Sequence, residues 1–236
     1  MNSPATSGAV AFFCLLCYNK AMITEKFYKL KELLLKAKIK KILTKMDGMF
    51  RHAIGPGDRR EYMMKKGITD RDWHFSLTAD DIIKNKIPSN VMGCTGRAKL
   101  FCKLAADVGL PCFAICTAYE PDWNDVRGGN EHTIDGHQVI AVKIDGQLRM
   151  FDPGKSRLEF INTDVVVGNL VDFGFRNMPG RYLITAIMSP DEYAKIDTYQ
   201  KLRNVYASGD MNNPEFVIAN QKKYRKVLFQ DMPNRR

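Results

Sequence analysis

A two-residue Asp-Gly turn between two strand-like stretches constrains the fold of this chain more than any other feature. Residues 137–144 (HQVIAVKI) precede the Asp-Gly pair at 145–146, and residues 147–154 (QLRMFDPG) follow it. Asp-Gly favours the positive φ angles of a tight turn, so we expect an antiparallel hairpin. The numbers of paired residues then add up to about 291, which places Asp152 within one or two positions of His137 across the hairpin.

The stretch GCTGRAKLFCKLAADVGLP (93–111) predicts a glycine turn that leads into an amphipathic helix. Its apolar residues recur three or four positions apart, and Gly109 followed by Pro111 marks its end. Cys94 lies where this helix begins. The unpaired N–H groups and partial positive charge of a helix N-terminus favour a thiolate over a thiol, so this position suits a nucleophile.

The other sequence patterns, together with the hairpin, predict an α+β domain. The expected elements are helices over 26–46, 78–87 and 189–209, a strand over 111–120 and a polar loop over 122–136. Thr78 and Ser189 are the expected N-caps of the second and third helices, and Glu192 completes a capping box with Ser189.

The domain organisation follows from one break in the helical pattern. A chain of 236 residues with 45% apolar residues is long enough to bury a core. The sequence IGPGDRR (54–60) interrupts the pattern. We therefore expect an N-terminal leader with a basic amphipathic helix, residues 1–57, before a domain of residues 58–236. The core of this domain is expected at 85–155, and C-terminal helices finish the chain.

The net charge of +10 is concentrated at the two ends of the chain. Residues 20–66 hold 14 Lys and Arg against 5 Asp and Glu, residues 221–236 hold 6 against 1, and residues 67–220 hold 16 against 20. Basic ends on a mildly acidic middle argue against a nucleic-acid groove lined throughout by cations. The basic segments either dock on an anionic membrane or an acidic partner, or pack on the domain with their lysines in water. The sequence does not choose between these two interpretations, and it does not determine the oligomeric state.

The six cysteines are too few for a disulfide scaffold. Cys14 and Cys17 form a single CxxC without a second pair or nearby histidines, so we expect apolar packing there rather than a metal site. Cys102, Cys112 and Cys116 lie in apolar surroundings and are expected in the core.

An apolar run at residues 10–20 (VAFFCLLCYNK) is too short to span a bilayer. The residues before it carry no Lys or Arg, and those after it make a poor cleavage site, so it lacks the pattern of a secretory signal. A cytoplasmic location is favoured, and secretion stays open.

His137 and Asp152 supply the two groups that a catalytic thiol at Cys94 needs. Nucleophilic catalysis requires a base within reach and a third group that orients the base. On the hairpin, Asp152 would fix the tautomer of His137 and stabilise the imidazolium that forms when the ring takes the thiol proton. The alternative base is His132 in the polar loop, where no carboxylate partner is implied.

These residues resemble a known family. GCTGRAKLFCKLAADVGLP, followed by GHQVIAVKIDGQLRMFDP, is similar to the core of the transglutaminase-like superfamily over roughly residues 85–155. The shared pattern is Gly-Cys at a helix start, Leu-x-x-x-x-Gly-Leu-Pro at its end, a Gly-His-x-x-x-x-Val strand and Asp-Pro after a hairpin. The resemblance implies a papain-like α+β fold in which the cysteine helix packs on an antiparallel sheet bearing the histidine and the aspartate. It implies Cys94 as nucleophile, His137 as general base and acid, and Asp152 as the orienting residue.

Two positions depart from the family pattern. Gln138-Val139-Ile140 stands where many members have an aromatic residue soon after the histidine, and Thr95-Gly96 stands where some have an acidic or aromatic residue. The aromatic packing contact is therefore missing or comes from elsewhere, and the subfamily and the substrate stay open.

The expected chemistry is acyl transfer on a peptide or protein carboxamide through a thioester on Cys94, with no cofactor and no metal. Water as the acceptor gives a protease, amidase or deamidase, and a lysine amine gives a transglutaminase. The sequence does not choose between them, because the choice depends on how well the site excludes water. The alternative is a catalytically inactive papain-like module that binds peptide and docks through its basic helices to a membrane or an acidic partner.

Five further residues are candidates for substrate or oxyanion contact. Trp73 and Trp123 either line an acyl-binding groove or pack as core or loop anchors, and the indole N–H of Trp73 is also a candidate oxyanion donor. Gly93, Thr95 and Gly136 complete the set.

Overall fold

The computed structural model describes most of the chain between residues 7 and 207. The described residues are 7–49, 64–65, 73–87, 89–122, 135–155, 157–175 and 180–207, with the backbone alone at 7–25, 73–74, 89–91, 203–204 and 207. The expected break at 54–60, most of the polar loop at 122–136, the basic segment 221–236 and the side chains of Cys14 and Cys17 lie outside this description.

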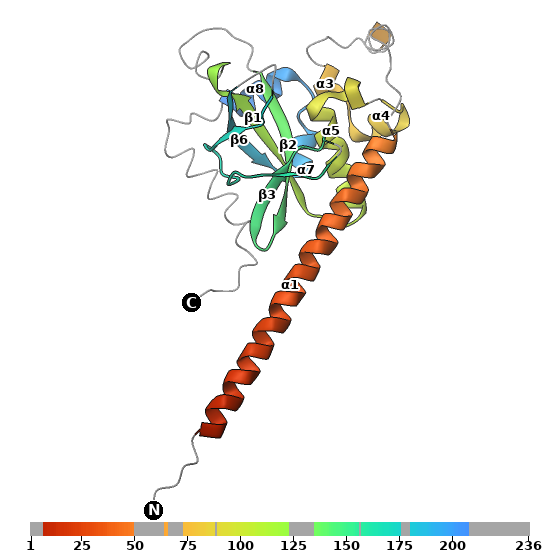
Figure 1. Ribbon diagram of the computed structural model, residues 1–236. Helices are drawn as coiled ribbons and strands as arrows, with labels where there is room; N and C mark the ends of the chain where they lie inside the picture. The colour runs from red at the N-terminus through yellow and green to blue at the C-terminus, as the bar shows by residue number, and fades with distance from the viewer. Residues whose placement is uncertain are drawn as a thin grey trace, which may run out of the picture.

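A six-stranded antiparallel sheet forms the centre of the fold (Figure 1). In spatial order its strands are β4 (Phe160–Ile161), β3 (Gln147–Phe151), β2 (Gly136–Ile144), β1 (Cys112–Tyr119), β6 (Arg181–Met188) and β5 (Leu170–Asp172). Together with the helices, this sheet confirms the α+β class. The strands β4, β5 and β6 follow the hairpin in the chain and extend the sheet beyond the strands that the sequence patterns predicted.

Helix α5 (Ser89–Asp107) packs on one face of the sheet, against β1 and β2. Alternate residues of β1, from Cys112 to Ala118, are buried against this helix in the larger core cluster. The intervening residues of β1 and β2 face a second cluster, in which Ile115 and Val139 pack with Val165. The cysteines expected in the core, Cys102, Cys112 and Cys116, are buried.

The hairpin of β2 and β3 has the register that its turn predicted. The pairs run from Ile144 opposite Gln147 to Ile140 opposite Phe151, so each pair adds up to 291. Asp145 and Gly146 have φ angles of 50° and 81°, as a two-residue turn of this kind requires. The register therefore followed from the turn position alone.

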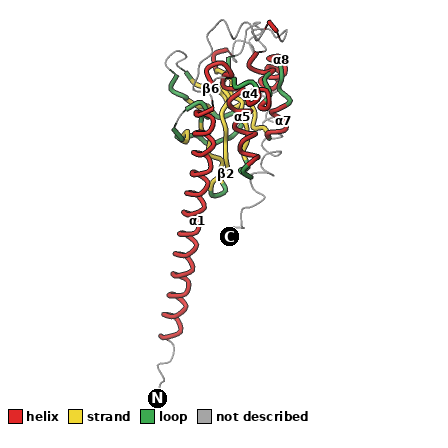
Figure 2. The backbone as a smooth tube through the Cα atoms, turned by 90° about the vertical axis from the view of Figure 1, so that its right-hand side faces the viewer, coloured by secondary structure: helices red, strands yellow, loops and turns green. Residues whose placement is uncertain are grey.

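Helix α1 (Ser7–Met49) contains the helix expected over 26–46 and is longer than expected. Four side chains of its C-terminal part, Ile39, Ile42, Leu43 and Met46, are buried in the larger core cluster. Burial of an aliphatic side chain of this size contributes about 1.5–3 kcal/mol. The N-terminal part of α1 extends away from the body in both views (Figures 1 and 2). Within the described residues, no helix combines the length and the apolarity needed to cross a membrane.

The short helices α3 (Trp73–Ser76) and α4 (Ala79–Lys84) lie beside α5. Thr78 is the N-cap of α4, as expected: its side-chain oxygen accepts a hydrogen bond from the backbone N–H of Asp81 at 3.0 Å. The Asp81 carboxylate in turn accepts from the backbone N–H of Thr78, which completes a capping box.

The prediction of a single helix over residues 189–209 is wrong. The structure has two shorter helices there, α7 (Pro190–Ala194) and α8 (Tyr199–Ala207). Ser189 caps α7 with Glu192, as expected. Between the two helices, the buried ammonium of Lys99 on α5 donates to the carbonyl oxygen of Ile196 at 2.7 Å. At the start of α8, the hydroxyl oxygen of Thr198 accepts from the backbone N–H of Lys201 at 3.3 Å.

Candidate active site

Cys94 occupies the first turn of the main part of α5 because the chain bends at Gly93. The φ and ψ angles of Gly93 are 64° and −175°, a combination that is essentially restricted to glycine. This bend separates the short turn at 89–92 from the helix that continues to Asp107. The partly exposed Cys94 thiol therefore lies at a helix N-terminus, where backbone N–H groups lack helical partners.

The hairpin places His137 and Asp152 in direct contact. His137 is the second residue of β2, Asp152 directly follows β3, and His137 Nε2 lies 3.0 Å from Asp152 Oδ2. The other carboxylate oxygen accepts from the backbone N–H of Gly154 at 2.7 Å. The hydroxyl of Thr117 on β1 donates to the carbonyl oxygen of His137 at 2.8 Å. Hydrogen bonds therefore hold both the carboxylate of Asp152 and the backbone of His137.

The imidazole of His137 also lies beside the Cys94 thiol, close enough for each group to shift the pKa of the other. Because Nε2 faces Asp152, Nδ1 is the ring nitrogen left for the sulfur. The structure thus brings Cys94 on α5, His137 on β2 and Asp152 directly after β3 together in one site.

The pKa values of these groups favour an ion pair. Burial works to raise the pKa of the Cys94 thiol, but the hydrogen bond and charge of His137 outweigh burial and lower that pKa below the ordinary value. Burial likewise works to lower the pKa of His137, while its hydrogen bonds to Asp152 and Cys94 raise it to about 9. For Asp152, burial works to raise the pKa, but the hydrogen bond and charge of His137, together with the Gly154 N–H and the charge of Arg97, lower it below the ordinary value. The site therefore favours a thiolate beside an imidazolium.

The buried side-chain amide of Gln138 lies next to the sulfur of Cys94. Gln138, on the helix-facing side of β2, accepts hydrogen bonds from Cys94 Sγ at 2.8 Å and from Thr95 Oγ1 at 2.9 Å, and donates to Tyr206 Oη at 2.7 Å. A thiolate has no proton to donate, so the ion-pair form requires the amide turned over, with Nε2 towards the sulfur. Tyr206 Oη then donates to Oε1, since a hydroxyl acts as donor or acceptor.

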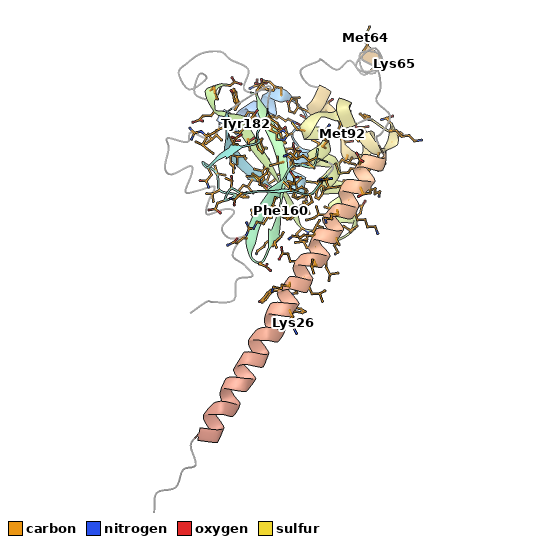
Figure 3. The ribbon with its side chains drawn as sticks, in the orientation of Figure 1. Lys26, Met64, Lys65, Met92, Phe160 and Tyr182 are labelled. Atoms are coloured by element: carbon orange, nitrogen blue, oxygen red, sulfur yellow. The ribbon has the colours of Figure 1, made fainter. Side chains whose placement is uncertain are left out.

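Aromatic side chains from the segment after β5 surround the imidazole. The rings of Phe173 and Phe175 lie 4.9 Å from the His137 ring, centroid to centroid, and both meet it edge to face. Tyr182 on β6, labelled in Figure 3, packs against both phenylalanines. The aromatic contact that is absent directly after the histidine in the sequence is therefore supplied by residues about 36 positions further along.

The structure places the other expected contact residues as follows. Gly93 forms the bend before Cys94. The side chain of Thr95 is 1% exposed and bonded to Gln138, so it points into the interior and is no substrate contact. Gly136 begins β2. Trp73 is in α3, its side chain outside the description, and Trp123 and His132 lie outside the described residues altogether.

Four residues of the site were missed by the sequence analysis: Gln138, Tyr206, Phe173 and Phe175. Gln138 had a usable signal, because it is a polar residue at the start of an otherwise apolar strand. The other three had none, since their neighbours in the site are far away in the sequence.

Gly136 allows the close approach of α8 to the site. A Cβ at this position would collide with Tyr206 Oη and with the carbonyl oxygen of Thr117 on β1. We expect Gly136→Ala to lower the free energy of unfolding by about 1–3 kcal/mol through overpacking, and to reduce turnover by moving Tyr206 away from Gln138. Urea unfolding and kcat/KM measure the two effects.

Gly48→Ala is the matched control for this substitution. A Cβ at Gly48 meets nothing within 4 Å, and the residue lies inside α1, so alanine should raise helix stability by up to about 1 kcal/mol. Equal effects of the two substitutions would contradict the packing role of Gly136.

Among the described residues, no group of three or more His, Cys, Asp or Glu side chains is placed to hold a metal ion. The chain matches no protein-family model, no curated protein and no solved structure.

Proposed function

We propose that the protein is a thiol enzyme that transfers acyl groups from a peptide or protein amide through a thioester on Cys94. The observation that carries this proposal is the placement of the Cys94 thiol at a helix N-terminus beside His137, whose ring is hydrogen-bonded to Asp152. A nucleophile, a base and an orienting group in direct contact are the requirements of this chemistry.

In the first half of the proposed reaction, the Cys94 thiolate attacks the carbonyl carbon of the substrate. The C–N bond breaks, the His137 imidazolium protonates the leaving amine, and a thioester remains. The oxyanion of the intermediate needs nearby donors, and the backbone N–H of Cys94, at the helix start, is one candidate. The indole of Trp73 is the second candidate donor.

In the second half, water or an amine attacks the thioester while neutral His137 takes its proton. The Cys94 thiolate leaves, and the ion pair is restored. Water gives a carboxylic acid and makes the protein a protease, amidase or deamidase, whereas a lysine amine gives an isopeptide bond and makes it a transglutaminase. Asp152 keeps the imidazole oriented and stabilises its positive charge throughout.

The proposal extends to membership of the transglutaminase-like superfamily and to a papain-like arrangement of the fold. In support, α5 carries Cys94 at its start and packs on the antiparallel sheet whose strands β2 and β3 carry His137 and precede Asp152. The three residues also occur in the chain order Cys, His, Asp that the family pattern has.

The test is identification of the products by mass spectrometry. The purified protein is incubated with a library of glutamine-containing peptides, with and without a primary amine, beside Cys94→Ala. We expect cleavage, deamidation or amine incorporation that is absent with Cys94→Ala, and the mass change names the reaction.

Cys102→Ala is the matched control, because Cys102 is a buried thiol on the same helix that takes no part in the site. Activity retained by Cys94→Ala would overturn the proposal. Peptide that binds without any Cys94-dependent change would favour the peptide-binding module instead.

The pH dependence of kcat/KM should be bell-shaped. The thiolate forms as the pH rises through the lowered pKa of Cys94, and the imidazolium is lost as the pH rises through about 9, the raised pKa of His137. Activity is expected between these limits, with apparent pKa values that belong to the pair. A profile of kcat/KM against pH measures both limbs, and a single rise near the ordinary thiol pKa with no alkaline fall would contradict the ion pair.

A further inference from the structure

Helix α1 exposes apolar side chains where it leaves the body. Of the seven large apolar side chains that are exposed in the described residues, five lie between residues 27 and 34. They are Phe27 at 53%, Tyr28 at 45%, Leu30 at 55%, Leu33 at 63% and Leu34 at 58% exposure. In a folded chain such a cluster marks a surface for an interaction rather than ordinary scatter.

Apart from Tyr28, this cluster is distinct from the face of α1 that packs on the domain. The buried face runs through Ile39, Ile42 and Met46, whereas Phe27, Leu30 and Leu34 follow a stripe roughly 120° away around the helix. The stripe begins next to Lys26, which Figure 3 shows on the part of α1 that leaves the body. The stripe is therefore not explained by the core of this domain.

Lysines border the apolar stripe. Residues 26–46 contain eight lysines and a single acidic residue, Glu32, which pairs with Lys36. By helical geometry Lys31 lies along one edge of the stripe and Lys26 and Lys29 along the other. The Lys31 ammonium lies over the Phe27 ring, 4.5 Å from its centre, in a cation–π contact.

An apolar stripe with lysines on both edges fits the surface of an anionic bilayer. The apolar side chains enter the boundary between headgroups and acyl chains, and the lysines reach the lipid phosphates and carboxylates. A second copy of α1 fits less well, because pairing two such helices brings eight lysines of each together. The sequence of α1 also continues without any charged residue from 9 to 18, further from the body.

We propose that the stripe of Phe27, Leu30 and Leu34 docks the protein on anionic membrane surfaces, with α1 lying in the interface and the body held beside it. The proposal does not depend on the chemistry at Cys94. If both hold, the acyl transfer takes place next to a membrane, which favours protein substrates that are bound to the same surface.

The test is co-sedimentation of the full chain with vesicles of phosphatidylcholine alone or with added phosphatidylserine, at low and at physiological salt. We expect binding only to vesicles that contain phosphatidylserine, with affinity that falls as salt rises. The double variant Leu30→Ser/Leu34→Ser should bind these vesicles at least about 10-fold more weakly than the wild type. The double variant Lys26→Glu/Lys31→Glu should show a comparable loss, because each lysine contributes about 5-fold near an anionic surface.

Val108→Ser is the matched control, because it removes an apolar side chain that is 42% exposed on the body, and its binding should equal that of the wild type. Urea unfolding establishes that all variants fold. No binding at low salt, or binding that neither double variant weakens, would overturn the proposal. So would a stable dimer that Leu30→Ser/Leu34→Ser dissociates in the absence of vesicle binding.

Alkylation of Cys94 by iodoacetamide should be the same in all these variants. The alkylation rate therefore tests the thiol chemistry and vesicle binding tests membrane docking, so the failure of one proposal can be told from the failure of the other.

Discussion

Replacing Cys94 with serine should reduce kcat/KM by about 10⁴-fold or more. The site lowers the pKa of a thiol through the hydrogen bond and charge of His137, but a serine hydroxyl ionises so much less readily that the same environment leaves it protonated. The side chains are nearly the same size, so the loss reports the nucleophile rather than the packing. Initial rates on a peptide substrate found by the product assay give the ratio.

Cys102→Ala serves as the control for this result as well, and its rate should stay within a few fold of the wild type. Near-ultraviolet circular dichroism and urea unfolding should show that Cys94→Ser keeps its fold. A Cys94→Ser variant within about tenfold of the wild-type rate would remove Cys94 from the role of nucleophile.

Removing the imidazole should make Cys94 unreactive at mildly acidic pH. In the wild type we expect rapid alkylation by iodoacetamide at about pH 6.5, because the thiolate is already present. In His137→Ala the hydrogen bond and the charge are gone, and the burial that works to raise the pKa of Cys94 remains. Alkylation at this pH should then fall on the order of 100-fold, with the inflection of its pH profile at or above the ordinary thiol pKa.

Asp152→Asn provides a graded comparison. The amide oxygen can still accept from His137 Nε2, while the negative charge that helps to raise the pKa of His137 is lost. The alkylation rate should lie between those of the wild type and His137→Ala. Equal rates for all three proteins at about pH 6.5 would show that His137 does not activate the thiol.

Local signals were sufficient for the elements that carry the candidate triad. The turn at Asp145-Gly146 set the register of the hairpin, and this register brings Asp152 to His137. Gly93 and the apolar spacing that follows it set the start of α5 at Cys94. These predictions held because turn geometry and helical periodicity act over a few residues and need no knowledge of distant partners.

The interruption between α7 and α8 was not predicted from the sequence. The run from 189 to 209 has a good N-cap and helical composition, yet it breaks at Ile196, whose carbonyl is bound by Lys99 about 100 positions earlier. The length of α1 was underestimated, because the apolar run at residues 10–20 belongs to the same helix as the residues from 26 onward.

The sequence alone determined the class of the fold, the hairpin and its register, the helix start at Cys94 and the three residues proposed for catalysis. Only the tertiary structure decided their surroundings: the Gln138 amide between Cys94 and Tyr206, the phenylalanines at 173 and 175 around His137, and the apolar stripe of α1 that the body does not cover. The reason is physical. Turns and helix starts depend on the conformational preferences of neighbouring residues, whereas the packing around a site depends on which distant segments the sheet brings together.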